Sequence, residues 1–111
     1  MSFKISIEAK EEIEKFILIF NIGILIALKK GLISIEDAEK ILYSPYSVDK
    51  LRDLSLNEEV IRLIELGCEL EDVESLIPYK LENSIDDIYN RTIELLHTSP
   101  EIYSFEKKWI E

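Results

Sequence analysis

The strongest constraint on the fold is residues 57–78, which have the pattern helix, glycine stop, helix, proline stop. Asn57 is a good N-cap, because its side-chain oxygen can accept from the free N–H groups of a first helical turn. Apolar residues then recur at three- and four-residue spacing until Gly67, which can take the left-handed backbone that ends a helix. A second stripe runs to Pro78, which cannot continue a helix. Two short amphipathic helices joined this tightly must bury their stripes against other parts of the chain.

The longest predicted helix covers about residues 8–30. Acidic side chains lie in its first turns, and Lys29 and Lys30 precede Gly31 at its end, which is the charge order that the helix dipole favours. Residues 16–28 are apolar on nearly every side, and such a helix must be covered all round. A membrane-spanning helix needs about 20 apolar residues. The shorter run here predicts a buried helix at the centre of the domain.

An amide and a glycine interrupt this apolar run. Asn21 either sets the register of a helix pair or a homodimer through a side-chain hydrogen bond, or is a core residue that nearby backbone satisfies. The second interpretation is preferred. Gly23 offers a place where another backbone can approach closely.

Further helices follow at short intervals. Ser34 and Asp37 have the spacing of a capping box and predict a helix start. Amphipathic stripes predict two more helices over about residues 48–54 and 85–97. Residues 100–109 begin with proline and carry an aromatic stripe, which predicts a last helix.

The first residues have a different pattern. Phe3, Ile5 and Ile7 alternate with polar residues, which is strand periodicity. No partner strand is evident in the chain. The segment is therefore either a non-helical arm that packs on the body or pairs across a dimer, or an early or frayed helical turn.

The composition supports one helical domain. The 111 residues include only three glycines and three prolines, which indicates helices joined by short loops, and no linker is visible. We predict an all-α fold, a compact single domain over residues 1–111, with five or six helices around the hydrophobic helix at residues 8–30.

One segment has an internal echo. Residues 35–42 align without gaps on residues 70–77, thirty-five positions later, and a Pro-Tyr pair follows each copy. The period suits a repeated helical hairpin. A chance agreement of capping and amphipathicity is the preferred explanation, since two copies are too few for a solenoid and acidic residues are common in first helical turns.

Negative charge dominates the chain. Twenty-three acidic and thirteen basic residues give a net charge of −10, and residues 31–99 carry sixteen acidic and six basic side chains. Such a surface repels phosphate backbones and anionic lipid headgroups, so direct binding to nucleic acid or to a membrane surface is not expected. A basic protein partner would be attracted, although solubility is a simpler explanation of the charge.

The acidic residues are densest in residues 58–74, where seven carboxylates accompany one arginine. These seven are the predicted partner-binding residues: Glu58, Glu59, Glu65, Glu69, Glu71, Asp72 and Glu74.

No catalytic, cofactor or metal site is predicted. Acidic neighbours disfavour the thiolate of Cys68, and nothing places this residue beside His97, the only histidine. Three carboxylate pairs lie one helical turn apart, but no histidine motif or calcium loop accompanies them. The pairs are Glu36 and Glu39, Asp49 and Asp53, and Glu71 and Glu74. A lone cysteine and the lack of a signal-peptide pattern predict a cytoplasmic protein.

Three stretches resemble a family of short bacterial proteins, about 110 residues long, that forms a domain of unknown function. They are G-L-I-S-I-E-D-A-E at 31–39, L-Y-S-P-Y-S-V-D-K-L at 42–51 and L-G-C-E-L-E-D-V-E-S-L-I-P at 66–78. The resemblance implies a bacterial cytosolic origin and one small domain. It brings no assigned catalytic residues, and it does not extend to residues 100–111.

The leading functional hypothesis is a non-enzymatic protein-binding module that presents the acidic surface of residues 58–74. Its sharpest form is an immunity or antitoxin-like protein that covers a basic toxin, because complementary charge speeds capture. One alternative is a structural or regulatory homodimer formed through the first helix or the aromatic tail. Another is a small metal protein or enzyme that uses clustered carboxylates.

Overall fold

The structure is a computed structural model that describes residues 1–101 and 108–111. The helices within the described residues are α1 (Lys10–Lys29), α2 (Ile35–Ile41), α3 (Pro45–Asp53), α4 (Glu58–Cys68), α5 (Leu70–Leu76), the 3₁₀ helix η1 (Pro78–Lys80) and α6 (Leu81–Thr98).

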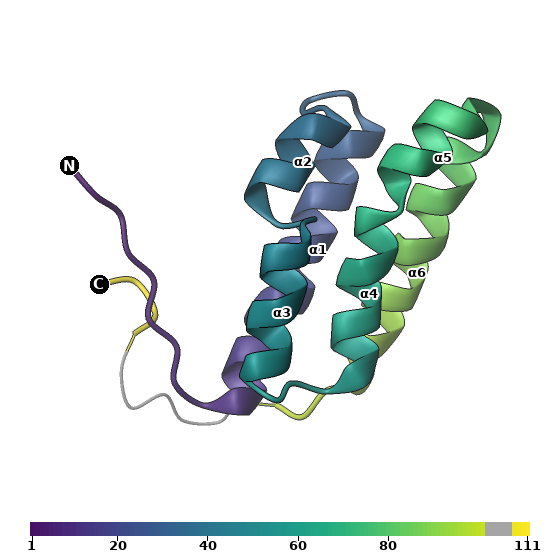
Figure 1. The fold of residues 1–111 in the computed structure, drawn as a ribbon. Helices are drawn as coiled ribbons and strands as arrows, with labels where there is room; N and C mark the ends of the chain where they lie inside the picture. The colour runs from purple at the N-terminus through teal and green to yellow at the C-terminus, as the bar shows by residue number, and fades with distance from the viewer. Residues whose placement is uncertain (102–107) are drawn as a thin grey trace.

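These helices make four passes through a compact all-helical domain (Figure 1). The chain rises through α1, descends through α2 and α3, rises through α4 and α5, and descends through α6. Only α1, α3, α4 and α6 are nine residues or longer, whereas α2 and α5 have seven residues each. The all-α prediction is confirmed. The predicted bundle of five or six helices is slightly off, because short helices share a pass with a longer one and four helices form the body.

Local capping explains where two of these helices begin. The Ser34 hydroxyl accepts from the backbone N–H of Asp37, and the Asp37 carboxylate accepts from the N–H of Ser34 at 2.9 Å, so the predicted capping box starts α2. The hydrogen bonds from Ser34 lower the pKa of Asp37. Asn57 caps α4 as predicted, accepting from Glu59 N–H at 2.8 Å.

The long helix α1 lies where the sequence predicts it, but it is not covered all round. Its inner face contains the buried Leu18 and Leu25 and packs mainly against α6. On the outer face, Ile19 is 50% exposed and Ile26 is 37% exposed. The prediction of a central helix is therefore wrong, because the neighbouring passes cover one face of α1 and leave the opposite face open.

A buried polar network ties three parts of the chain together. The Asn21 amide of α1 donates to Thr92 Oγ1 of α6 at 3.0 Å, and the Tyr43 hydroxyl donates to Asn21 Oδ1. Thr92 donates in turn to the Ile88 carbonyl at 2.7 Å. Asn21 and Thr92 are fully buried. Asn21 therefore joins a helix pair within the chain through side-chain hydrogen bonds, and the preferred interpretation, satisfaction by nearby backbone, is wrong.

Tyr43 connects this network to α4. Burial raises the pKa of its phenol far above the ordinary value of 10.0, which keeps the hydroxyl protonated as a donor. Its ring lies against Gly67, where a Cβ atom would overlap three ring carbons. Gly67 lies inside α4 and has no left-handed backbone; among the glycines only Gly31 does, with a φ of 71°. The predicted helix end is therefore correct to within one residue, because α4 ends at Cys68, but the predicted left-handed glycine is wrong, and Gly67 instead makes room for Tyr43.

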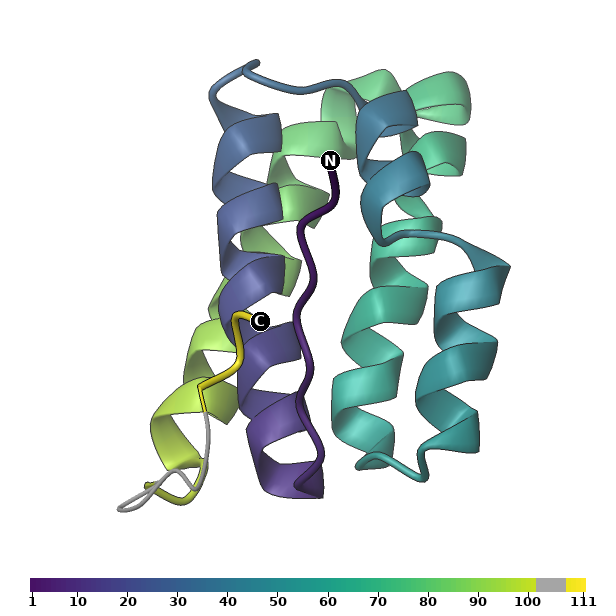
Figure 2. The ribbon, with the colours of Figure 1, turned by 90° about the vertical axis from the view of Figure 1, so that its left-hand side faces the viewer.

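The N-terminal arm pairs with the C-terminal segment, which the sequence did not predict. Ile5 forms an antiparallel bridge with Ile110, and Ser6 N–H donates to the Trp109 carbonyl at 2.8 Å. The Trp109 indole donates a hydrogen bond to Glu12 at 3.0 Å, and its ring packs edge-on against Phe16 with the ring centroids 5.9 Å apart. These two contacts join the C-terminal segment to α1. Figure 2 shows the arm beside α1 and the C-terminal segment.

These contacts correct two expectations about the ends of the chain. The strand-like arm is non-helical, as one alternative proposed, but it pairs within the chain. Of the predicted helix over residues 100–109, residues 102–107 lie outside the described residues, and Trp109 lies in a bend. Within residues 1–101 and 108–111, no helix combines the length and the apolar character needed to cross a membrane.

Candidate functional site

The seven predicted binding residues lie along the third pass but do not form one uniform surface. Glu58 and Glu59 occupy the first turn of α4. Glu71, Asp72 and Glu74 lie on α5 at the other end of this pass, and all five are exposed. The structure therefore divides the predicted site into a lower and an upper part.

The carboxylates between these two parts form ion pairs. Glu65 pairs with Arg52 of α3 at 3.3 Å, and Glu69 pairs with Arg62 of α4 at 3.6 Å. Their side chains are about one third to one half exposed, so each pair contributes little to stability. These two carboxylates are already neutralised and are less available to a partner.

The upper part gains two carboxylates that the binding prediction omitted. Helix α2 packs against α5 and brings Glu36 and Glu39 to Glu71 and Glu74. We call these four residues the upper acidic patch. Partial burial, the charge of Glu71 and a hydrogen bond with it raise the pKa of Glu39, and Glu36 and Glu74 add to the effect.

The internal echo was the sequence signal for this patch. Its two copies are the seven-residue helices α2 and α5, which contact each other, and their equivalent first residues Ile35 and Leu70 are both buried. The two glutamate pairs occupy equivalent positions in the echo. The alignment therefore contained the residues of the patch, although it did not predict that the copies meet.

The raised pKa of Glu39 gives a pH prediction. In the folded protein Glu39 holds its proton more strongly than at its ordinary value of 4.5. The Glu39 carboxyl therefore adds to the stability of the folded protein at pH values below 4.5. This contribution is lost as the pH rises through the raised pKa. We expect Glu39→Gln to stabilise the protein near pH 7 and to reduce the loss of stability between a pH below 4.5 and pH 7.

Urea unfolding at the two pH values tests this expectation. Asp49→Asn is a matched control, because it removes one charge from an exposed position on α3. An equal change of stability with pH in the wild type and in Glu39→Gln would contradict the assignment.

Cys68 and His97, the two residues considered as a nucleophile and its base, lie apart in the structure. Cys68 is the last residue of α4 and His97 is in the last turn of α6, and these two helices run in opposite directions. Partial burial and the charge of Glu65 raise the pKa of Cys68, which disfavours its thiolate. Among the described residues, no three acidic, histidine or cysteine side chains are grouped so that they could hold a metal ion.

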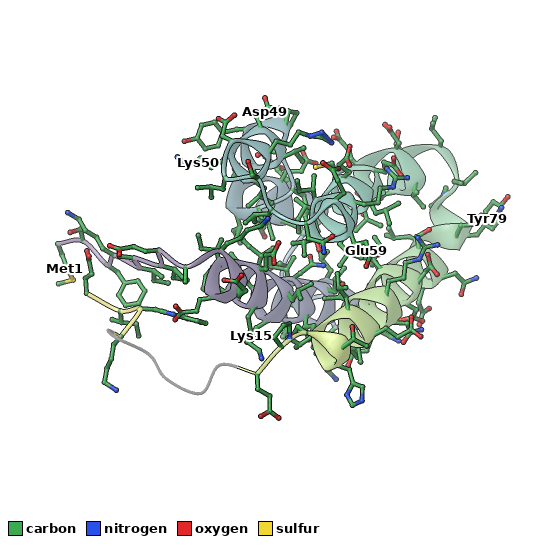
Figure 3. All side chains as sticks on the ribbon, turned by 90° about the horizontal axis from the view of Figure 1, so that it is seen from below. Met1, Lys15, Asp49, Lys50, Glu59 and Tyr79 are labelled. Atoms are coloured by element: carbon green, nitrogen blue, oxygen red, sulfur yellow. The ribbon has the colours of Figure 1, made fainter. Side chains whose placement is uncertain are left out.

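The lower part of the site borders a groove between α4 and α6. Its volume is about 590 Å³, and Glu58 and Glu59 line it from the first turn of α4. Leu63, Leu66 and Leu95 supply apolar surface. Figure 3, a view from below, labels Glu59 on α4. We call this feature the α4/α6 groove.

A family model described as "Protein of unknown function (DUF3969)" matches residues 8–111. The match includes the C-terminal residues 100–111, to which the resemblance of the three motifs did not extend. No curated protein and no solved structure matches the chain.

Proposed function

Because the chain belongs to the DUF3969 family, whose function is unknown, we propose a function from its surface: it is a cytoplasmic, non-enzymatic module that binds a basic protein. The binding surface is the acidic side of α4 and α5, extended by α2. In its sharpest form, the module is an immunity or antitoxin-like protein that covers a basic toxin.

The upper acidic patch is the observation that supports this proposal. Lys40 pairs with Glu36 at 3.4 Å, and within the described residues Glu39, Glu71 and Glu74 have no ion pair. Carboxylates held together without a counter-charge oppose folding. Departures of this kind from the most stable arrangement are expected at functional sites. A cationic partner would supply the missing counter-charge and would be attracted from a distance.

Capture from a lysate of the source organism tests the proposal at low and high salt. We expect a basic partner that high salt releases, and that the Glu71→Lys, Asp72→Lys, Glu74→Lys variant fails to capture. The control carries Asp49→Lys, Asp53→Lys and Glu82→Lys, which make the same change in net charge at exposed positions outside the proposed surface. Equal capture by the wild type and both variants would contradict the proposal.

A second candidate function, a homodimer, is supported by the open outer face of α1. Ile19, Gly23 and Ile26 are exposed on successive turns, and apart from the adjoining residues and backbone of α1 no heavy atom lies within 4 Å of the position that a Cβ of Gly23 would occupy. A second copy of α1 would fit closely against a face of this kind.

Light scattering at micromolar concentration tests this alternative. We expect a dimer that the Ile19→Lys, Ile26→Lys variant converts to a monomer. A monomeric wild type would rule the dimer out at that concentration, and would leave the proposed binding of a basic partner unaffected.

A further inference from the structure

We infer that the α4/α6 groove is the docking site for an amphipathic helix of the partner, with an apolar stripe flanked by lysine or arginine. This inference rests on the proposed binding of a basic protein, and it specifies the partner segment and the place where it binds.

The inner surface of the groove is apolar. Leu63 is buried beneath it, whereas Leu66 of α4 and Leu95 of α6 are only half-buried and remain accessible. Apolar side chains of a partner would remove the exposed parts of these two leucines from water, which favours association. Helix-binding grooves commonly combine an apolar inner surface, here called the floor, with charged side chains along the edges, here called the rim.

The rim carries an excess of negative charge. Glu58, Glu59 and Glu94 line the groove, and none of them forms an ion pair within the described residues. The two arginines on the rim are already paired: Arg62 with Glu69 at 3.6 Å, and Arg91 with Asp87 at 3.2 Å. The carboxylates that remain free fit cationic side chains of a partner.

The dimensions of the groove suit about two turns of helix. Its lining residues on α4 run from Glu58 to Leu66, which corresponds to about 12 Å at 1.5 Å per residue. A partner helix of that length places apolar residues at positions i, i+3, i+4 and i+7 on one face. The flanking positions then bring lysine or arginine to the two edges, where the free glutamates lie.

A fluorescent peptide that has leucine at this spacing and lysine elsewhere tests the inference by fluorescence anisotropy. We expect the wild type to bind it, and Glu58→Gln, Glu59→Gln, Glu94→Gln to weaken binding by about tenfold at low salt. The matched control is Asp49→Asn, Asp53→Asn, Glu82→Gln, which removes the same charge at exposed positions outside the groove and outside the acidic surface of α4 and α5, and should change binding little. A peptide of the same composition with its leucines scattered should bind weakly.

A second variant tests the floor separately from the charge. Leu66→Asp, Leu95→Asp places polar groups on the half-buried leucines and should abolish binding, with circular dichroism to verify that the helices persist. Amide chemical shifts on addition of the peptide should change along α4 and α6.

Each other outcome overturns the groove inference in a recognisable way. Equal weakening by the rim variant and the control variant means that charge alone binds the peptide. A third variant, Glu71→Gln, Asp72→Asn, Glu74→Gln, is measured beside them, and selective weakening by this variant moves the site to the upper acidic patch. Both outcomes leave the proposed function standing. No binding by the wild type removes the groove as a helix site, while capture of a basic partner from lysate still decides the proposed function. A change of oligomeric state in the rim variant would identify a second copy as the occupant instead.

Discussion

Replacing Gly67 with alanine should lower the free energy of unfolding by about 2–4 kcal/mol, although alanine is the better helix former. The new methyl group would overlap the ring of Tyr43, which is 3% exposed and has little room to move. If the ring shifts, its hydroxyl loses Asn21 Oδ1, and each buried polar group left without a partner costs about 1–3 kcal/mol. The gain in helix propensity, about 1 kcal/mol, offsets only part of this loss.

Gly23→Ala is the matched control, since both glycines lie inside helices. Apart from the adjoining residues and backbone of α1, no heavy atom lies within 4 Å of the Cβ position at Gly23, so alanine should stabilise the protein by about 0.5–1 kcal/mol. Urea unfolding of the two variants at low protein concentration measures whether their changes in the free energy of unfolding have opposite signs. A Gly67→Ala variant as stable as the wild type would contradict the close packing of Tyr43 on α4.

The second large effect concerns the buried network. Asn21→Leu should lower the free energy of unfolding by about 2–4 kcal/mol, because the Tyr43 hydroxyl loses its acceptor and a branched side chain enters a packed site. Thr92 keeps its bond to the Ile88 carbonyl and adds little to the cost.

The change in the free energy of unfolding caused by Tyr43→Phe should then have opposite signs in the wild type and in the Asn21→Leu variant. In the wild type it should destabilise by about 1–3 kcal/mol, because it leaves Asn21 Oδ1 without its donor. In the Asn21→Leu variant it removes a hydroxyl that already lacks a partner, so it should stabilise. A double-mutant cycle from urea unfolding measures this coupling.

Exposed tyrosines provide the controls for the cycle. Tyr46 and Tyr79 are 80% and 79% exposed, so their replacement by phenylalanine should change stability little in either background. If Tyr43→Phe had the same cost in both backgrounds, the hydrogen bond between Tyr43 and Asn21 would have no energetic role.

Features that depend on neighbouring residues could be predicted well from the sequence. The caps of α2 and α4 are hydrogen bonds that span two or three residues, and periodicity located α1 to within two residues at its start and one at its end. The seven acidic residues were identified correctly as a dense run. Their division into paired and free groups was not predictable, because Arg52 and the glutamates of α2 approach only in the folded chain.

The sequence by itself determined which segments are helices, which faces are apolar and how strongly negative the domain is. These properties follow from backbone preferences and side-chain chemistry over one or two turns. Tertiary structure alone decided the partners of Asn21, one of them 71 positions away, the role of Gly67 as space for a ring, and the meeting of α2 with α5. Each of these depends on how far-separated side chains pack into a shared volume, and local patterns contain no information about the residue that fills the space opposite.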